Sequence, residues 1–569
     1  MCGIIMGSPA GSFPTAACSG PDPSCLRRTS MPTPGSCATS RRRAGVLALA
    51  AVLLLTIPSA AQTFRYDDSW DDHGLTVTRQ SPGGVRLNLS LASWELGTEP
   101  INGRGQAVVH TPGVFLPNDA GAPNLPGFSQ YLAMPEGATA RVTVVRARTE
   151  VLTGIDLAPA PVIPLETEDG PLTYERDAAI YGRDAPYPAE VAMVSDRTEI
   201  RGVDAVMLGV TPFQYNPATR ELTVYRDLEI DIVFEGGRGA VGEDRLRNRW
   251  FEPILRDIFA NHDLLPALPP APRPAGRTPD HEYVIITPPA TSYVAWADSL
   301  ARFRNEQGIR TGVVTTNEVG GNTASAIETY IDDAYHTWDV PPVAVLLLGD
   351  YGSGDGAIIA PTWDGYCVSD NIYADVTGND LPDVVLARMA AANPTHVETF
   401  VRKVIDYERQ PPTTPGYYQN PIVAGGWQTE RWFILCDEVL HGFMSNELGK
   451  TPVREYAIYD GTPGSIWSTA SNTGTVVDYF GPNGLGYIPS TPAHLDDWGG
   501  NATRLNAALE SGAFILQHRD HGDVDGWGEP AYSQSHVAQL ANTDPSFVFS
   551  INCLTGMFDY PGECFAETF

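Results

Sequence analysis

The chain has 569 residues, 43% hydrophobic and 18% charged, which suits three or four folded domains and excludes wholesale disorder. Its 37 Lys and Arg stand against 68 Asp and Glu, so the formal net charge is −31. A surface of that charge repels phosphate backbones, which argues against nucleic acid as a partner, and it would attract Ca²⁺ and basic peptides.

The N-terminal residues predict an export signal. Residues 1–30 are rich in Ser, Pro, Gly and Cys without periodicity, and are interpreted as a non-native upstream extension. Within 31–61, three arginines precede an apolar run over 44–57 and then small residues, the order found in a cleavable signal peptide. The run is shorter than the roughly 20 residues of a membrane-spanning helix, so a secreted or cell-surface protein without a membrane span is expected.

Cysteines are unevenly distributed. Four of the eight lie in the first 37 residues and none occurs between Cys37 and Cys367. An exported protein that relies on disulfides would have them more densely spaced. The later cysteines are therefore predicted to be mostly free thiols, one of which could be reactive.

Residues 62–262 predict an all-β domain. Alternating apolar and polar residues, bounded by Gly, Pro and Asn, indicate half-buried strands at 75–78, 140–145, 222–225 and 228–234. No catalytic grouping of residues occurs there. The Pro-rich stretch 263–277 that follows is predicted to be an exposed linker open to proteolysis.

From residue 278 strands alternate with helices, which predicts mostly parallel sheets covered on both faces. We divide this part into subdomain A, 278–410, and subdomain B, 413–569. The predicted strands of A are 283–287, 312–315, 343–348 and 383–389, and its helices are 293–307, 324–338 and one capped by Asn393. The predicted strands of B are 422–426, 457–459, 514–517 and 547–551, and its helices are 430–448 and one capped by Asn501.

Two predicted strands of subdomain B lead into residues that could be catalytic. Strand 514–517 runs towards His521 and Gly522, and strand 547–551 runs into Cys553. Ligands bind at the carboxyl ends of parallel strands, so both side chains are expected at the edge where a site should lie. A thiol needs an adjacent imidazole to become a nucleophilic thiolate, and the Gly522 and Cys553 N–H groups could bind an oxyanion. On spacing alone, a buried cysteine and a His-Gly turn remain alternatives.

Three sequence motifs occur within about the last 290 residues of the chain. The first is His521-Gly522 with Trp527, Glu529 and Pro530, which fits H-G-x-x-x-x-W-x-[DE]-P. The others are Asn552 to Tyr560 with Glu563 to Glu567, and Ser369 to Tyr373 with Gly378 to Asp380 and Asp383 to Arg388, ending in Ile405 to Arg409.

At these stretches the sequence resembles the gingipain family of cysteine peptidases, which have a caspase-like fold. The resemblance implies that His521 is the general base, Cys553 the nucleophile and Gly522, with Cys553, the oxyanion hole. No cofactor is required for such chemistry. It also implies that 62–262 is a propeptide, that maturation occurs in the linker after Arg273 or Arg277, and that protein or peptide substrates are cut.

The family also suggests a structural Ca²⁺, with Asp350, Asp380 and Asp383 at the matching positions. Carboxylates on loops suit a hard cation, but these residues could instead cap turns. Members of the family continue past the position of Phe569, often with a C-terminal export signal. The chain is therefore expected to be a fragment. Its missing C-terminal region is expected to interact with export machinery.

The sequence departs from the family pattern beside the histidine. Asp520 stands where the family usually has Gly, and Gln517 where it has Asn. A carboxylate beside the imidazole should favour its charged form and change the pH optimum. His518 is a rival base, but Gly follows only His521, and Cys564 is expected to be a packed residue. A surface sortase with the same dyad, and an adhesion protein with a degenerate site, are the alternative functions.

Overall fold

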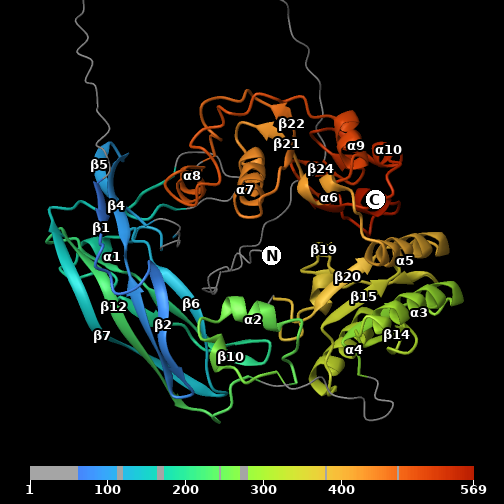
Figure 1. Cartoon of the computed structure of the whole chain (residues 1–569), viewed down its shortest axis with the longest axis horizontal. Helices are drawn as coiled ribbons and strands as arrows, with labels where there is room; N and C mark the ends of the chain where they lie inside the picture. The colour runs from blue at the N-terminus through green and yellow to red at the C-terminus, as the bar shows by residue number, and fades with distance from the viewer. Residues whose placement is uncertain are drawn as a thin grey trace, which may run out of the picture. The chain divides into compact units, whose positions relative to one another are not determined.

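The computed structural model describes residues 62–569, except for 112–113, 115–118, 163–171, 243–244, 269–279, 379–380 and 471–472 (Figure 1). The predicted upstream extension, the signal peptide and the linker arginines Arg273 and Arg277 lie outside the described residues. No helix in the described part of the chain is both long and apolar enough to cross a bilayer.

Antiparallel strands dominate the described residues of 62–262. The two longest, β7 and β12, have 16 residues each and pair along their whole length. The strands are β1 (Gln62–Arg65), β2 (Gly74–Ser81), β3 (Gly84–Ser90), β4 (Ser93–Ile101), β5 (Arg104–His110), β6 (Phe128–Ala133), β7 (Ala138–Thr153), β8 (Ala192–Val194), β9 (Thr198–Ile200), β10 (Val203–Val210), β11 (Phe213–Asn216) and β12 (Glu221–Gly236).

These strands form three sheets. The largest has the order β11-β12-β3-β2 with β7 also on β12, the second β6-β10-β8 with β9 on β10, and the third β1-β4-β5. Among the described residues the segment also contains the short helices α1 (Ala178–Tyr181) and α2 (Glu252–Ile258) and the 3₁₀ turn η1 (His262–Leu264). Strands are therefore the main regular structure of the segment, which also contains short helices.

Strand β12 shows how the alternation predicted from sequence works. Leu228, Ile230 and Ile232 are buried and pack in one core with Leu87 and Leu89 of β3. The sequence predicted two strands here, but the structure has one, with an irregularity in its pairing to β7 near Tyr225. A bulge of this kind bends a strand without ending it.

Subdomain A contains a parallel sheet of order β14-β13-β15-β20, with helices on both faces (Figure 1). Ile285, Leu346 and Leu348 pack with helices α3 and α5 on one face, and Ile286 and Leu347 pack with α4 on the other. The elements are β13 (Tyr283–Thr287), α3 (Thr291–Glu306), β14 (Thr311–Thr315), α4 (Ala324–Thr337), β15 (Ala344–Leu348), β20 (Val385–Met389) and α5 (Pro394–Arg409).

In its described residues, the long connection between β15 and β20 carries only short elements. They are β16 (Asp350–Tyr351), β17 (Ala357–Ile358), β18 (Thr362–Trp363), β19 (Cys367–Val368) and η2 (Asp370–Tyr373). The Asn393 side chain accepts hydrogen bonds from the first N–H groups of α5, so the predicted cap is present.

Subdomain B repeats the design with the parallel order β22-β21-β23-β27. Val423 and Trp427 pack on the α7 side, while Ile422, Ala424 and Leu516 pack on the α9 side. The elements are α6 (Pro415–Gln419), β21 (Ile422–Gln428), α7 (Phe433–Asn446), β22 (Val453–Asp460), α8 (Thr473–Phe480), α9 (Ala502–Glu510), β23 (Ile515–Arg519), β24 (Gly522–Asp523), β25 (Gly526–Trp527), β26 (Tyr532–Ser533), α10 (Gln534–Val537), β27 (Phe547–Ile551) and α11 (Phe565–Thr568).

The β-rich segment is tied to subdomain A by buried contacts. The Arg201 guanidinium donates to the carbonyl oxygens of Leu246, Asp383 and Pro342 at 3.1, 2.6 and 3.1 Å. Leu246 itself lies in the apolar core that contains Ile286 of β13. Asp383 and Pro342 precede β20 and β15, so this anchor lies at the amino ends of the strands.

Candidate active site

His521 and Cys553 follow neighbouring strands at the same level of one sheet. Strands β23 and β27 are parallel, and Arg519 of β23 is paired with Ile551 of β27. His521 and Cys553 each lie two residues beyond this last pair. Because the strands are parallel, both residues leave the sheet at its carboxyl edge, where sites form in open α/β sheets.

At Gly522 the segment after His521 directly contacts the segment around Cys553. A Cβ atom placed on Gly522 would lie 2.9 Å from the carbonyl oxygen of Cys553 and 3.0 Å from Cγ2 of Thr555. Such distances are shorter than side chains tolerate against a backbone oxygen. The glycine therefore allows the residue after His521 to pack directly on the backbone of Cys553.

The His521 ring is held by one polar and two aromatic side chains. Its Nε2 lies 2.7 Å from Oε1 of Gln428, the last residue of β21. The Phe433 ring meets it edge-on at 5.1 Å and the Tyr459 ring lies at 4.8 Å between centroids. An amide oxygen only accepts, so Nε2 carries the proton and Nδ1 is left as the basic nitrogen.

Cys553 is exposed and free, at a sharp turn of the chain. The N–H of Thr555 donates to the Cys553 carbonyl oxygen at 2.7 Å, and Leu554 between them has φ of 59°. Bulky residues seldom adopt this left-handed conformation, which costs of order 1–3 kcal/mol and clusters at functional sites. The turn presents the thiol at the sheet edge instead of burying it.

The rival residues occupy structural positions. His518 is fully buried and stacks on Trp527 with 3.9 Å between ring centroids. Its Nε2 donates to the Glu529 carbonyl at 3.1 Å, its Nδ1 accepts from Asn552 at 2.7 Å, and burial lowers its pKa to about 3. Burial likewise raises the pKa of the Cys564 thiol to about 11, which disfavours a thiolate there.

The Asp520 side chain is buried, and its carboxyl forms a hydrogen bond to the backbone. Its Oδ2 accepts the Glu529 backbone N–H at 2.6 Å, inside the loop that carries His521. Burial raises the pKa of its carboxyl to about 6. This carboxyl is therefore engaged by the backbone of the loop and is charged only above weakly acidic pH.

The proposed calcium ligands do not form one group. Asp350 lies two residues beyond Leu348 at the carboxyl end of β15, whereas Asp383 precedes Val385 at the amino end of β20. These strands are parallel and in register, so the two residues lie at opposite ends of the sheet, roughly 25 Å apart at 3.3 Å per residue. They cannot share an ion, and Asp380 lies outside the described residues.

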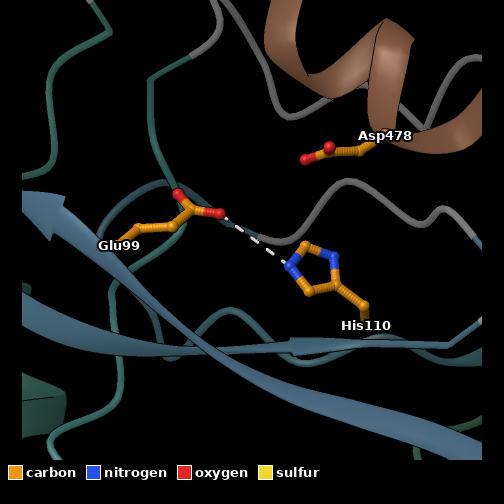
Figure 2. A group of neighbouring side chains, drawn as sticks. All are labelled: Glu99, His110 and Asp478. Atoms are coloured by element: carbon orange, nitrogen blue, oxygen red, sulfur yellow. Dashed lines mark ion pairs between the residues drawn. The ribbon is translucent and has the colours of Figure 1, made fainter. Parts of the chain in front are cut away.

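Among the described residues, one other group of side chains has the residue types and spacing to bind a metal ion. Figure 2 shows Glu99 of β4 and His110 of β5 turned towards each other, with Asp478 of α8 nearby. One ligand atom from each lies within 4.8 Å of the others, and Glu99 and His110 form an ion pair at 3.8 Å. An ordinary cluster of charged side chains has the same appearance, so the geometry assigns no ion.

Sequence reasoning missed the residues that hold the imidazole. Gln428, Phe433 and Tyr459 come from β21, α7 and β22, three elements other than the strand that leads to His521. Gln428 ends β21, which pairs with β23, so it lies at the same sheet edge as His521, but the predicted strand stops at residue 426.

A thiol and an imidazole at the carboxyl edge of a parallel sheet are the elements of a cysteine-type peptidase. The model of peptidase family C25 matches residues 277–569, and the model of its propeptide matches 97–262. The chain belongs to peptidase family C25, a family of cysteine-type hydrolases, and carries the propeptide of that family.

Similar curated proteins come from Porphyromonas gingivalis. Gingipain R2 of strain W83 is 24% identical over 480 residues, which cover 83% of this chain and 58% of that protein. Lys-gingipain of strain ATCC 33277 is 24% identical over 542 residues, which cover 92% and 28%. The chain thus spans about half the length of the first of these relatives, and less of the second.

Solved structures show weaker likeness. The crystal structure of the Arg specific cysteine proteinase gingipain R aligns with a TM-score of 0.39 and 20% identity, covering 52% of this chain and 60% of that one. A complex of Porphyromonas gingivalis RgpB pro- and mature domains aligns with a TM-score of 0.30 and 21% identity, covering 33% and 97%. Both scores are too low to carry an argument about this chain.

Proposed function

We propose that this chain is a cysteine endopeptidase made as a zymogen, with Cys553 as nucleophile and His521 as general base. One observation carries the proposal: the two residues leave neighbouring parallel strands at the same level, and Gly522 packs on the backbone of Cys553. We assign the catalytic region to the caspase-like fold on the same grounds, together with its membership of family C25.

The chemistry follows from these groups. Nδ1 of His521 takes the proton of the Cys553 thiol, and the thiolate attacks the carbonyl carbon of the scissile bond. The N–H groups of Gly522 and Cys553 would stabilise the resulting oxyanion. Collapse expels the amine, which takes the proton from His521 and leaves a thioester. Water, deprotonated by His521, attacks this acyl-enzyme and releases the acid and the thiol.

Latency and export belong to the same proposal. The propeptide match over 97–262 supports a zymogen, with maturation in the linker after Arg273 or Arg277. The buried contacts of Arg201 with subdomain A support a propeptide that stays docked after the linker is cut. A secreted or surface location follows from the predicted signal peptide. Finding full activity with the propeptide still covalently attached would contradict the zymogen proposal.

The decisive experiment is hydrolysis of a peptide library, varied at the residue before the cut, by the chain after its linker has been cut by limited proteolysis and by Cys553→Ala treated in the same way. The proposal predicts cleavage by the former and none by the latter. Addition of an amine acceptor distinguishes a transpeptidase, because a sortase would transfer the acyl group and not hydrolyse it. If the chain shows no turnover and iodoacetamide does not alkylate Cys553, an adhesion protein with a degenerate site is the remaining function.

We also propose that a structural Ca²⁺ binds in the loop before β20, with Asp380 and Asp383 but not Asp350 as ligands. Asp383 has one carboxylate oxygen engaged by the Thr377 N–H at 2.8 Å, and Asp380 is three residues away. Carboxylates on one loop suit this cation. A chelator should lower the melting temperature of the chain but not of Asp380→Ala, while Asp350→Ala should respond like the parent. An unchanged melting temperature in chelator would count against calcium.

A further inference from the structure

Asn552, directly before the proposed nucleophile, forms hydrogen bonds through both ends of its side-chain amide. Its Nδ2 lies 2.7 Å from Nδ1 of His518, and its Oδ1 accepts from the hydroxyls of Ser550 at 2.9 Å and Thr555 at 2.8 Å. The Asn552 side chain therefore folds back along the sheet, because His518 of β23 is paired with Ser550 of β27. The amide joins the segment of the nucleophile to the strand that leads to the proposed base.

The tautomer of His518 determines how this amide is oriented. Nε2 of His518 lies 3.1 Å from the Glu529 carbonyl oxygen, which can only accept, so Nε2 carries the proton. Nδ1 is therefore an acceptor, and its partner must be the NH2 group of Asn552. The amide oxygen then faces the two hydroxyls, which donate to it. All these contacts are satisfied in one orientation of the amide.

Trp527 and Glu529 connect the same group of side chains to the histidine loop (residues 521–529). The Trp527 ring stacks on His518 with 3.9 Å between centroids, and its Nε1 donates to Oγ of Ser550 at 2.8 Å. The Glu529 carbonyl oxygen accepts from His518. The network therefore contacts the histidine loop at one end and the turn of the nucleophile at the other.

Thr555 closes the turn around Cys553. The residue is buried, its hydroxyl donates to Asn552, and its N–H donates to the Cys553 carbonyl oxygen at 2.7 Å. Its carbonyl oxygen accepts the Ala566 N–H at 2.9 Å, which ties the turn to α11. Leu554 inside the turn has the left-handed φ of 59°. Such a conformation persists only where the surrounding structure holds it, and the Asn552–Thr555 hydrogen bond spans the strained residue.

Asn552 and Thr555 also line the space beside Gly522. A Cβ atom on Gly522 would lie 3.0 Å from Cγ of Asn552 and 3.0 Å from Cγ2 of Thr555. The two side chains that hold the turn are thus packed against the residue that follows His521. A shift of either side chain changes the position of Cys553 relative to the imidazole.

We propose that Asn552 is a positioning residue for Cys553, because its amide ties the turn of the nucleophile to His518 and, through Thr555, holds that turn closed. This rests on the proposed peptidase function and extends it to the residues that align the nucleophile. The N–H of Cys553 belongs to the planar peptide group that begins at the Asn552 carbonyl carbon. Asn552 therefore fixes the direction of this oxyanion donor as well as the place of the thiol.

The test compares the parent chain and Asn552→Ala, each after its linker has been cut, with Asn322→Ala as the matched control. Asn322 is likewise half-buried, and its amide forms three hydrogen bonds to backbone groups of the β15–β20 connection in subdomain A. Three quantities are measured at pH 7: kcat and KM on a cleaved library peptide, the alkylation rate of Cys553 by iodoacetamide, and the melting temperature.

Asn552→Ala should lower kcat about tenfold or more with KM within about twofold of the parent, because substrate contacts remain while the nucleophile and the oxyanion donor lose their alignment. The alkylation rate of Cys553 should fall about threefold or more, because the thiol leaves the imidazole. Both asparagine variants should have a lower melting temperature, since each leaves polar groups without partners. Asn322→Ala should keep kcat and the alkylation rate within about twofold of the parent.

Two variants of Thr555 test the same restraint and replace Asn552→Ala if that variant does not fold. Thr555→Val keeps the shape of the side chain but removes the hydroxyl, so kcat should fall roughly 5–20-fold, the equivalent of one hydrogen bond. Thr555→Ser keeps the hydroxyl, so kcat should stay within about twofold of the parent.

The proposal is overturned if Asn552→Ala keeps the kcat and the alkylation rate of the parent, or if Asn322→Ala loses them to the same extent. Equal kcat in Thr555→Val and Thr555→Ser would also overturn it. Hydrolysis by Cys553→Ala treated in the same way, or none by the parent, would instead refute the peptidase proposal itself, so the two failures are distinguishable.

Discussion

Oε1 of Gln428 lies 2.7 Å from Nε2 of His521, so the amide fixes which imidazole nitrogen carries the proton. Gln428→Ala should lower kcat by about tenfold or more with little change in KM, because the ring loses its tautomer and orientation but no substrate contact. Gln428→Glu keeps an acceptor and should retain activity, with the acid limb of the pH profile moved to higher pH, because the carboxylate favours the charged imidazole. Steady-state kinetics across pH would check both, and an unchanged kcat in the alanine variant would rule out this role.

Gly522 should not tolerate a side chain. In Gly522→Ala the new methyl group would meet the Cys553 carbonyl oxygen at 2.9 Å, so the histidine loop must move away from the nucleophile. We expect kcat/KM to fall roughly 100-fold, as for small misplacements of catalytic groups, with little change in melting temperature. Gly556→Ala is the matched control, because a Cβ there meets nothing within 4 Å and activity should be retained. Equal activity of the two variants would show that the close approach is not needed.

Arg201 should anchor the propeptide to subdomain A. Arg201→Ala removes the donor of the Asp383 and Pro342 carbonyl oxygens, whereas the Leu246 carbonyl oxygen also accepts from Asn248 at 3.4 Å. Each unsatisfied buried group costs about 1–3 kcal/mol, so a loss of about 2 kcal/mol or more is expected in urea unfolding. Arg79→Ala, which removes an exposed ion pair at 4.0 Å, should cost less than about 1 kcal/mol. Similar midpoints for both variants would argue against the anchor.

His518 should make the fold sensitive to acid. Burial lowers its pKa to about 3, below the unfolded value near 6.5, so its contribution to stability is complete above 6.5 and is lost as pH falls towards 3. The slope is at most about 1.4 kcal/mol per pH unit. His518→Gln should be less stable at pH 7 but show a shallower slope between pH 6 and 4, measured by urea unfolding at each pH. A slope equal to that of the exposed-site control His336→Gln and of the parent would disprove this assignment.

Most of the α/β region could be predicted from apolar periodicity and caps. Strands β13 and β27 have the predicted bounds, and Asn393 and Asn501 cap the predicted helices. Buried parallel strands and amphipathic helices carry their own pattern, so the sheet edge holding His521 and Cys553 could be inferred before any coordinates.

The sequence missed the partner of the histidine for a physical reason. The predicted strand 422–426 ends two residues before Gln428, whereas β21 extends to Gln428. Gly425 and Gly426 are needed within β21 because the carboxyl oxygens of Asp437 and Asp520 approach it within 2.2 and 2.4 Å of where a Cβ would stand. Only the packing across the sheet could reveal that space.

Two residues of the predicted calcium set, Asp350 and Asp383, lie apart in the structure. Asp350 follows strand β15 and Asp383 precedes strand β20, so parallel pairing separates them. Because Asp350 follows one predicted parallel strand and Asp383 begins another, strand direction alone implies this separation.

The central claim is that His521 activates the Cys553 thiol, and the most direct measurement is the alkylation rate of that thiol by iodoacetamide at pH 7. Exposed Cys367 in the same chain serves as the internal reference. The account predicts that Cys553 reacts at least tenfold faster than Cys367 in the parent, and that this advantage disappears in His521→Ala but not in His336→Gln. Equal rates at Cys553 in the parent and in His521→Ala would contradict it.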